Sequence, residues 1–418
     1  MKYLDSLNGL FCVPGLDSIR ELLYRLGNPQ DCVKYIHIAG TNGKGSVGSY
    51  ITEVLITQGY SVGRYVSPAV LNPLEIIQFN KTPIEEDVFD EIIDKIHRIC
   101  DEMVEDGLRQ PTRFEVETAA AYIFFADKRC DFAVIECGMG GLLDATNVIV
   151  PKCSVITSIS VDHTSFLGDS ITEITSHKAG IIKNSVPAVS AIQNEDAMSV
   201  IKVKAIELSS ELTIASDICN VRPTKDGIYF DYKEYKDLCT SILGTYQPMN
   251  AALAIECILC LKRQGYYFSD ENVYAGILKA NWFGRFTKLG SNPDFWIDGA
   301  HNADGGKALL ECLKTYYPNE KLTFIVGFLA DKDYKSILDL CMPFCKRFIA
   351  IETPDNPRAL SSKALAEFVK NNYDVGVVDF NSINDAVANA LSYKDSAIIV
   401  FGSLSHLAMV KEAYDNHT

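Results

Sequence analysis

The glycine-rich segment His37-Ile38-Ala39-Gly40-Thr41-Asn42-Gly43-Lys44-Gly45-Ser46 is the feature that most restricts the fold of this chain. It follows a short apolar run typical of a buried strand, residues 35–38, and precedes a helical stretch, residues 47–58. In such a unit, glycines allow a tight turn with inward-pointing N–H groups, and a lysine and a helix N-terminus add positive potential. The segment therefore predicts a polyphosphate-binding loop within an α/β domain.

The spacing within this loop departs from the common GxxxxGK[ST] pattern. The first glycine of that pattern would fall at Ile38, and Gly45 separates Lys44 from Ser46. The alternative is a glycine-rich turn that contains a lysine by chance. The strand before the loop and the helix after it favour phosphate binding.

Strand-like apolar runs alternate with helical patterns through most of the 418 residues, which favours parallel sheets covered by helices. Because the chain is long for one core, we expect two α/β domains. These are a P-loop-type ATPase domain with a largely parallel sheet, residues 1–288, and a smaller Rossmann-like domain, residues 289–418. The turn-rich residues 289–293 are the expected linker. The expected strands are residues 35–39, 61–66, 132–137, 154–158 and 188–191, then 295–298, 323–327, 347–351, 375–378 and 397–401. The expected helices include residues 88–104, 116–127, 171–183, 306–316, 362–371 and 383–391.

Composition excludes several classes of protein. An apolar content of 47% with 22% charged residues is ordinary for a globular protein, and the net charge of −15 argues against a nucleic-acid partner. The chain has no apolar run of membrane-spanning length, and its start lacks a signal-peptide pattern, so we expect no membrane association and a cytoplasmic location. Of the thirteen cysteines, Cys257 and Cys260 form a CxxC pair. The pair lies in an apolar helical stretch without a second ligand pair, so we expect core packing rather than a metal or redox site.

Polar side chains follow several expected strands, at the sheet edge where ligands bind in open α/β folds. Glu136 ends one apolar run, and a carboxylate there suits Mg²⁺, although it could instead be a solvated strand end or a helix cap. Asp162 and His163 follow the next strand, and an isolated histidine is more often structural than a ligand. Ser67 is either a weak metal ligand or a turn residue before Pro68.

Three further groups are candidates for the site, and two of them, Arg285 and the segment from Asp298 to Asn302, point to a cleft between the two domains. Lys178 lies in a helical stretch, where a lysine is usually solvated. The segment from Asp298 to Asn302, which includes His301, ends the first expected strand of the second domain. Arg285 precedes the expected linker and could neutralise phosphate charge in the same cleft.

Taken in order, these motifs closely resemble the folylpolyglutamate synthase/dihydrofolate synthase family of the Mur ligase superfamily. The resemblance runs from about Gly15 to Ser403. The motifs that carry it are the HxAGTNGKGS loop, Ser67-Pro68, Phe114-Glu115 with Thr118, Glu136 with Gly140-Gly141, Leu143-Asp144-Ala145-Thr146-Asn147, Asp162-His163-Thr164, Leu167-Gly168-Asp169, Lys178-Ala179-Gly180-Ile181, Gln247 with Asn250, Gly284-Arg285-Phe286, Asp298 to Asn302, and Gly402-Ser403-Leu404.

The resemblance implies ATP-dependent amide bond formation. ATP would phosphorylate a folate carboxylate, and the amino group of L-glutamate would attack the acyl phosphate and release phosphate. Many bacterial members of the family also join glutamate to dihydropteroate. The partners implied are therefore L-glutamate and a folate, either tetrahydrofolate or dihydropteroate, and the chain is expected to act as a monomer.

The resemblance also assigns roles to individual residues. Gly40, Thr41, Asn42, Gly43, Lys44, Gly45 and Ser46 would hold the ATP phosphates, with Lys44 on their outer oxygens. Ser67 and Glu136 would bind one Mg²⁺ ion, and His163 would help to bind a second. Lys178 matches a lysine that is carbamylated in the family. Asn250, Arg285, Asp298 and His301 would contact the nucleotide. Lys44, His163, Lys178 and His301 are the expected catalytic residues.

Three departures from the family pattern lie on the acceptor side. Ala69 replaces the usual histidine, Ile76 replaces an arginine after Glu75, and Leu142 replaces another arginine. We expect them to alter the recognition of folate or glutamate rather than to abolish activity. A nucleotide-binding paralogue with little ligase activity is one alternative, favoured by these losses. A Mur-type ligase acting on a cell-wall precursor is the other, opposed by Gly45 and by the absence of an obvious preceding UDP-binding domain.

Overall fold

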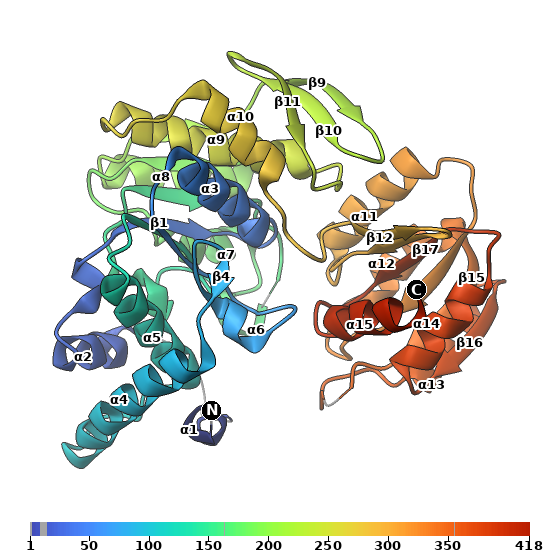
Figure 1. Ribbon diagram of the computed structural model, residues 1–418, viewed down its shortest axis with the longest axis horizontal. Helices are drawn as coiled ribbons and strands as arrows, with labels where there is room; N and C mark the ends of the chain where they lie inside the picture. Colours follow the sequence, from blue (N-terminus) through green and yellow to red (C-terminus); the bar gives the residue numbers. More distant parts are fainter. Residues whose placement is uncertain (1, 9–14, 163, 355) are drawn as a thin grey trace.

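The computed structural model describes residues 2–8, 15–162, 164–354 and 356–418 (Figure 1). An eight-stranded sheet occupies the N-terminal part, in the order β4-β3-β2-β5-β1-β6-β7-β8. The strands from β2 to β8 in this order are parallel, and β3 and β4 are antiparallel additions at one edge. The bounds are β1 Lys34–Ala39, β2 Val62–Tyr65, β3 Ile77–Phe79, β4 Thr82–Pro83, β5 Phe132–Glu136, β6 Cys153–Ile156, β7 Ala188–Ser190 and β8 Leu212–Ile214. All five strands expected here are confirmed.

Helices cover both faces of this sheet. One face packs against α3 (Lys44–Gln58), α9 (Gln247–Arg263) and α10 (Asp270–Lys279). The other packs against α2 (Asp17–Arg25), α4 (Glu86–Glu105) and α5 (Arg113–Asp127). The remaining helices of this part are α1 (Lys2–Ser6), α6 (Thr164–Leu167), α7 (Ile171–Ala179) and α8 (Glu195–Glu207). The helix expected over residues 171–183 is shorter than predicted, because the chain leaves helical geometry after Ala179.

A small antiparallel sheet, in the order β11-β10-β9, was not predicted. Its strands are β9 Ile218–Pro223, β10 Ile228–Tyr232 and β11 Tyr235–Thr240. β10 and β11 contribute Phe230, Tyr232, Tyr235 and Leu238 to the core beside α9. The exposed β9 has no alternating apolar pattern, which is why the sequence did not reveal it.

The C-terminal part forms a six-stranded sheet, in the order β12-β13-β17-β14-β15-β16, beside the first part in Figure 1. Its strands are β12 Thr287–Ser291, β13 Asp294–Ile297, β14 Leu322–Val326, β15 Cys345–Ile351, β16 Gly376–Phe380 and β17 Ile398–Phe401. All are parallel except β12. Its helices are α11 Ala303–Tyr316, α12 Tyr334–Cys341, α13 Ser362–Asn372, α14 Ile383–Ser392 and α15 Leu407–His417. The expected α/β fold with two sheets, the second one Rossmann-like, is confirmed.

The linker expected at residues 289–293 is wrong. These residues form the end of β12 and the turn into β13, and Thr287 of β12 pairs with Ile297 of β13. Glycine and proline mark a hairpin turn as readily as a linker, so the composition of the segment was ambiguous. The chain passes between the two sheets earlier, between Lys279 and Thr287.

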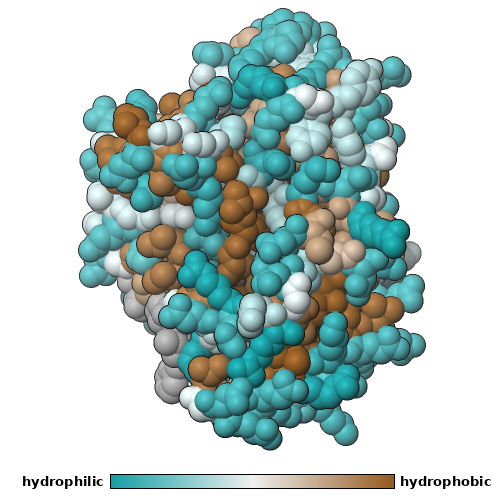
Figure 2. Space-filling view, turned by 90° about the vertical axis from the view of Figure 1, so that its left-hand side faces the viewer, coloured by the Kyte–Doolittle hydropathy of each residue, from teal (hydrophilic) through white to brown (hydrophobic). Residues whose placement is uncertain are grey.

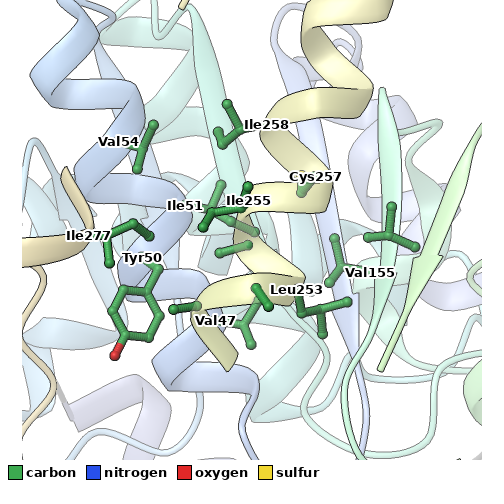
Figure 3. Packing of buried hydrophobic residues seen from close by; sticks show 14 of the residues in the cluster. Val47, Tyr50, Ile51, Val54, Val155, Leu253, Ile255, Cys257, Ile258 and Ile277 are labelled. Carbon is green, nitrogen blue, oxygen red and sulfur yellow. The ribbon is translucent and has the colours of Figure 1, made fainter. Parts of the chain in front are cut away.

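Helix α3, which begins at the glycine-rich loop, is one of the most deeply buried elements. Every residue from Gly45 to Leu55 is buried. Figure 3 shows Val47, Tyr50, Ile51 and Val54 of this helix together with side chains of α9, α10 and β6. Because a helix that is buried on all sides is held by core packing, the loop at its start is mounted on a rigid support.

The face drawn in Figure 2 is mostly hydrophilic, with hydrophobic side chains gathered in places. Among the helices of the described residues, none combines the length and apolar character needed to cross a bilayer. The described cysteines are free thiols, and Cys257 and Cys260 are fully buried in the core beside the large sheet. Core packing of this CxxC pair is therefore confirmed.

Candidate nucleotide and ligation site

Each glycine of the loop stands where a side chain would collide with a neighbour. A Cβ atom at Gly40 would lie 1.8 Å from Thr157 Oγ1, and one at Gly45 would lie 2.4 Å from Nε1 of Trp282. Gly43 combines a φ of +92° with a Cβ position 2.8 Å from Asn250 Oδ1. The unusual glycine between Lys44 and Ser46 is thus required by the indole of Trp282.

Some backbone N–H groups of the loop are hydrogen-bonded within the protein, and others are open to a ligand. The N–H groups of Thr41 and Asn42 both donate to the carbonyl oxygen of Ser158, at 2.8 Å and 3.3 Å. The backbone amides of these two residues therefore already have partners within the protein. The N–H groups of Lys44, Gly45 and Ser46 form the first turn of α3, where backbone donors have no intrahelical partner.

A cavity of about 340 Å³ lies between the loop and the second sheet. From the first part of the chain it is lined by Asn42, Gly43 and Ser46 of the loop and by Asn250 of α9. From the connection and the second sheet it receives Arg285, Asp298 and His301. The structure thus brings together seven of the residues that sequence reasoning placed around the nucleotide.

Asp298 and His301 differ in what they offer to this cavity. The Asp298 carboxylate accepts hydrogen bonds from the N–H groups of Phe286 and Ala300, each at 2.8 Å, so it mainly fixes the cavity wall. His301 Nδ1 lies 2.8 Å from the carbonyl oxygen of Gly299. Burial lowers the pKa of His301 to about 4, so the ring is neutral at pH 7. With Nδ1 donating to the carbonyl, Nε2 remains an acceptor.

Two lysines meet on one carbonyl group at the base of the loop. Lys178 Nζ donates to the Gly40 oxygen at 2.9 Å, and Lys44 Nζ donates to the same oxygen at 3.2 Å. Lys178 is only 3% exposed, so its reading as a solvated surface lysine is wrong. Burial and the neighbouring Lys44 charge lower the pKa of Lys178 to about 7. At neutral pH a large share of Lys178 therefore carries no charge.

Glu136 ends β5 beside one of these lysines, with Oε1 3.9 Å from Lys44 Nζ. Burial raises the pKa of its carboxyl group, and the charges of Lys44, Arg64 and Arg285 oppose that rise. The described residues contain no cluster of three His, Cys, Asp or Glu side chains that would hold a metal ion alone. Mg²⁺ keeps several waters and needs only one or two protein carboxylates, so Glu136 fits such an ion beside bound phosphates.

Ser67, the other expected ligand of this ion, follows β2 at the same edge of the sheet. β2 and β5 are parallel neighbours, and Tyr65 of β2 pairs with Ile135, the residue before Glu136. Ser67 also lines a second cavity. His163 lies outside the described residues. Its neighbour Asp162 bridges the two halves of the molecule, accepting from Lys332 Nζ at 3.1 Å and from Asn302 Nδ2 at 3.3 Å. Asn302 also contacts Asn42 of the loop, at 3.3 Å.

A second cavity, of about 400 Å³, lies between the start of α5 and the segment that follows β5. Its wall includes Ser67, Phe114 and Asp144. Asp144 is buried, and burial raises the pKa of its carboxyl group. It accepts hydrogen bonds from Met139 N at 2.8 Å and from Thr146 N at 3.1 Å.

His37, the first residue of the loop motif, belongs to the support of this second cavity rather than to the phosphate site. Its Nε2 lies 2.9 Å from Thr146 Oγ1 and 3.1 Å from Cys137 Sγ. Burial lowers the pKa of His37 to about 3, so the ring is neutral. His37 thus links β1 to the segment that carries Asp144.

The three departures from the family pattern fall on two surfaces. Ala69 and Ile76 line a third cavity, of about 380 Å³, that adjoins the second one at Ser67. Leu142 is 43% exposed, and its side chain lies where a Cβ atom at Gly180 would be. Glu75 orders the loop between Ala69 and Ile76, because its carboxylate accepts hydrogen bonds from the N–H groups of Val70 and Leu71.

Sequence reasoning missed several residues that build the site. Arg64 is buried in β2, donates to the Gly45 oxygen at 2.7 Å and stacks on Trp282 with its Cζ 4.1 Å from the ring centre. Thr157 closes the space at Gly40, and Lys332 ties the second sheet to Asp162. A single charge inside an apolar strand was the one available signal for Arg64. The contacts of Trp282, Thr157 and Lys332 join distant segments and leave no local pattern.

Comparison with known proteins gives matches that together span nearly the whole chain. The family described as Mur ligase middle domain matches residues 38–258, and Mur ligase, glutamate ligase domain matches residues 284–404. A dihydrofolate synthase/folylpolyglutamate synthase of Bacillus subtilis is 32% identical, over 96% of this chain and 94% of its own length. A folylpolyglutamate synthase of Lacticaseibacillus casei is 33% identical, over 99% of this chain and 98% of its own length.

Solved structures agree with these sequence matches. The Mycobacterium tuberculosis folylpolyglutamate synthase complexed with ADP superimposes with a TM-score of 0.90 at 29% identity, over 100% of this chain and 97% of that one. E. coli FolC in complex with DHPP and ADP gives a TM-score of 0.87 at 27% identity, over 99% of this chain and 96% of that one. Together with the loop, the interdomain cavity and the two domain matches, these similarities show that the chain belongs to the folylpolyglutamate synthase/dihydrofolate synthase family of Mur ligases.

Proposed function

We propose that this protein is an ATP-dependent ligase that adds L-glutamate to a folate through an acyl-phosphate intermediate. The observation that carries the proposal is the position of the lysine pair and Glu136. Lys44 and Lys178 share the Gly40 carbonyl, and Lys44 Nζ lies 3.9 Å from Glu136 Oε1. Lys44 follows Gly43 of the cavity shared by the two sheets, and Glu136 lies two residues before Gly138 of the cavity beside Phe114. Homologues with that activity match the chain over nearly its whole length.

The first step transfers a phosphoryl group to the acceptor. A carboxylate oxygen of the folate attacks the γ-phosphorus of ATP, the bond from that phosphorus to the bridging oxygen breaks, and ADP leaves. Lys44 would move from the Gly40 carbonyl to the phosphate oxygens, and the open N–H groups of Lys44 to Ser46 would receive phosphate oxygens at the helix N-terminus. Mg²⁺ held at Glu136 would neutralise phosphate charge.

The second step forms the amide. The unprotonated amine of L-glutamate attacks the carbonyl carbon of the acyl phosphate, and the C–O bond to phosphate then breaks with loss of the amine proton. An acyl phosphate is readily hydrolysed, so the site must exclude water. The contacts that Asn302 and Lys332 make with Asn42 and Asp162 close the second sheet over the loop and serve this purpose.

The acceptor would bind in the cavity beside Phe114. A flat aromatic ring system gains from contact with an aromatic side chain, and Phe114 provides one there. The buried Asp144 offers a carboxyl group for hydrogen bonds to ring N–H donors. Glu136 lies two residues before Gly138 of this cavity, so the reactive end of the acceptor would face the nucleotide loop.

Lys178 is proposed to be carbamylated, as the family resemblance implies. A neutral amine attacks CO₂ and loses a proton, giving an N-carboxylate. Its lowered pKa, about 7, supplies the neutral amine. With ¹³C-labelled bicarbonate at pH 8, we expect a carbamate signal in the NMR spectrum that weakens as the pH falls below about 7, because the ammonium form cannot react.

Substitution assigns that signal to one lysine. Lys178→Ala should remove it, whereas Lys183→Ala, at a partly buried lysine nearby in the chain, should retain it. A signal of equal strength in Lys178→Ala would contradict the assignment.

The ligase activity is tested with purified protein, ATP, Mg²⁺ and L-glutamate, with tetrahydrofolate and dihydropteroate supplied separately. We expect a product heavier by one glutamyl unit and one ADP released per product. ATP turnover with no glutamylated product on either acceptor would instead identify a nucleotide-binding paralogue. This alternative is favoured by the replacement of one histidine and two arginines of the family pattern by Ala69, Ile76 and Leu142.

Several finer properties belong to the same proposal. We propose a monomer, because both sides of the nucleotide cavity come from one chain. We propose a boundary between the ATPase domain and the Rossmann-like domain between Lys279 and Thr287, and a cytoplasmic location where folates and ATP are available.

A further inference from the structure

The two cavities that meet at Ser67 share a single cation. Arg113 lines both the cavity of about 400 Å³ beside Phe114 and the cavity of about 380 Å³ beside Ile76. Every other described residue that lines either cavity is neutral or acidic. Arg113 is therefore the one positive side chain among the described residues on these walls.

Neighbouring acidic and amide groups hold the Arg113 guanidinium in a defined orientation. Its Nε lies 2.7 Å from Glu117 Oε1, one helical turn further along α5. Its Nη1 lies 3.1 Å from Asn8 Oδ1 and 3.6 Å from Asp5 Oδ1. Its Nη2 forms no hydrogen bond with the described residues. With 38% of the side chain exposed, one edge of the guanidinium remains open to a ligand.

The ligand that fits this edge is a carboxylate. A guanidinium binds a carboxylate through two parallel hydrogen bonds, and that pairing strengthens when the site is partly closed to water. Ala69 and Ile76 add no charge to the same walls. The acceptor of the proposed reaction carries carboxylates. They would emerge at the wall between the cavity beside Phe114, where the ring system would bind, and the cavity beside Ile76.

We propose that Arg113 binds the non-reacting carboxylate on the glutamate tail of the acceptor. This inference rests on the proposed function and names a specificity-determining residue for it. Dihydropteroate has only the carboxylate that reacts, whereas tetrahydrofolate has a second one on its glutamate. Arg113 therefore distinguishes acceptors that already carry glutamate from those that do not.

Direct binding measurements test this assignment without requiring turnover. Dissociation constants of tetrahydrofolate and of dihydropteroate are measured by calorimetry with a non-hydrolysable ATP analogue and Mg²⁺ present. Arg113→Gln is expected to raise the dissociation constant of tetrahydrofolate about 10- to 100-fold, the range for a lost charge-assisted pair. The dissociation constant of dihydropteroate should change less than about twofold. Arg113→Lys should lie between, because it keeps the charge without the paired donors.

Arg129→Gln is the matched control, since it makes the same change at an exposed position just beyond the other end of α5. It should bind both acceptors as the unsubstituted protein does, and thermal melting establishes that both variants fold. Unchanged binding of tetrahydrofolate by Arg113→Gln, or equal weakening of both acceptors, would overturn the proposal. Absence of ligation by the unsubstituted protein would count against the proposed function and leave these binding ratios interpretable.

Discussion

Glu136→Gln is expected to lower the rate of glutamylation by at least about 100-fold, the scale on which one electrostatic contact to developing charge affects an enzyme. The amide keeps the shape of the side chain at the end of β5 but removes the charge that would hold Mg²⁺ beside Lys44. The steady-state rate should be measured against Mg²⁺ concentration. The unsubstituted protein should saturate, and the variant should remain slow at any concentration.

Two measurements separate loss of the ion from loss of the fold. The variant should still melt cooperatively, and it should bind ADP in the absence of Mg²⁺ at least as tightly, because a carboxylate that repels phosphate has been removed. Glu207→Gln, an exposed position on α8, is expected to leave the rate unchanged. A Glu136→Gln protein with near-normal turnover would remove Glu136 from the site.

Gly45→Ala is expected to raise the KM for ATP about 5- to 150-fold. The added Cβ would lie 2.4 Å from the Trp282 indole, so the loop or the indole must move, and such overpacking costs about 1–3 kcal/mol. At about 1.4 kcal/mol for each factor of ten, this range corresponds to the expected change. The KM for ATP and the dissociation constant of ADP both measure it.

Gly48→Ala provides the control within the same helix. Its Cβ would lie 3.5 Å from Ile38 Cδ1, an ordinary contact, and alanine favours a helix interior over glycine by about 1 kcal/mol. This variant should bind ATP normally and melt at the same or a slightly higher temperature. If Gly45→Ala bound ATP as well as Gly48→Ala, the steric account of Gly45 would be wrong.

The regular elements were predictable where one periodic pattern extended over a buried surface. β1, β5 and β6 are buried on both faces and appear in the sequence as continuous apolar runs, so they were found nearly to the residue. Residues 289–293 were misread because a hairpin turn and a linker use the same glycine and proline. β9 was missed because its side chains face solvent and carry no pattern.

The residues of the candidate site were likewise predictable only where they form a local sequence pattern. The loop and the Asp298 to Asn302 segment were recognisable because each is a contiguous motif, and the structure brings both to one cavity. Contacts such as Arg64 on Trp282, or Lys332 on Asp162, join segments far apart in the chain. No local pattern encodes them, because each partner is ordinary until the fold brings the two together. Lys178 was ambiguous for the same reason, since its burial depends on packing against the loop.

The contact between Gly45 and Trp282 limits how chains of this kind can diverge. A side chain at position 45 becomes acceptable only after Trp282 has been exchanged for something smaller. That exchange would in turn leave the buried Arg64 guanidinium without its aromatic partner and the Gly45 carbonyl without a well-placed donor. We therefore expect the three positions to covary among descendants, although they lie in three separate segments and none of them needs to touch the substrate.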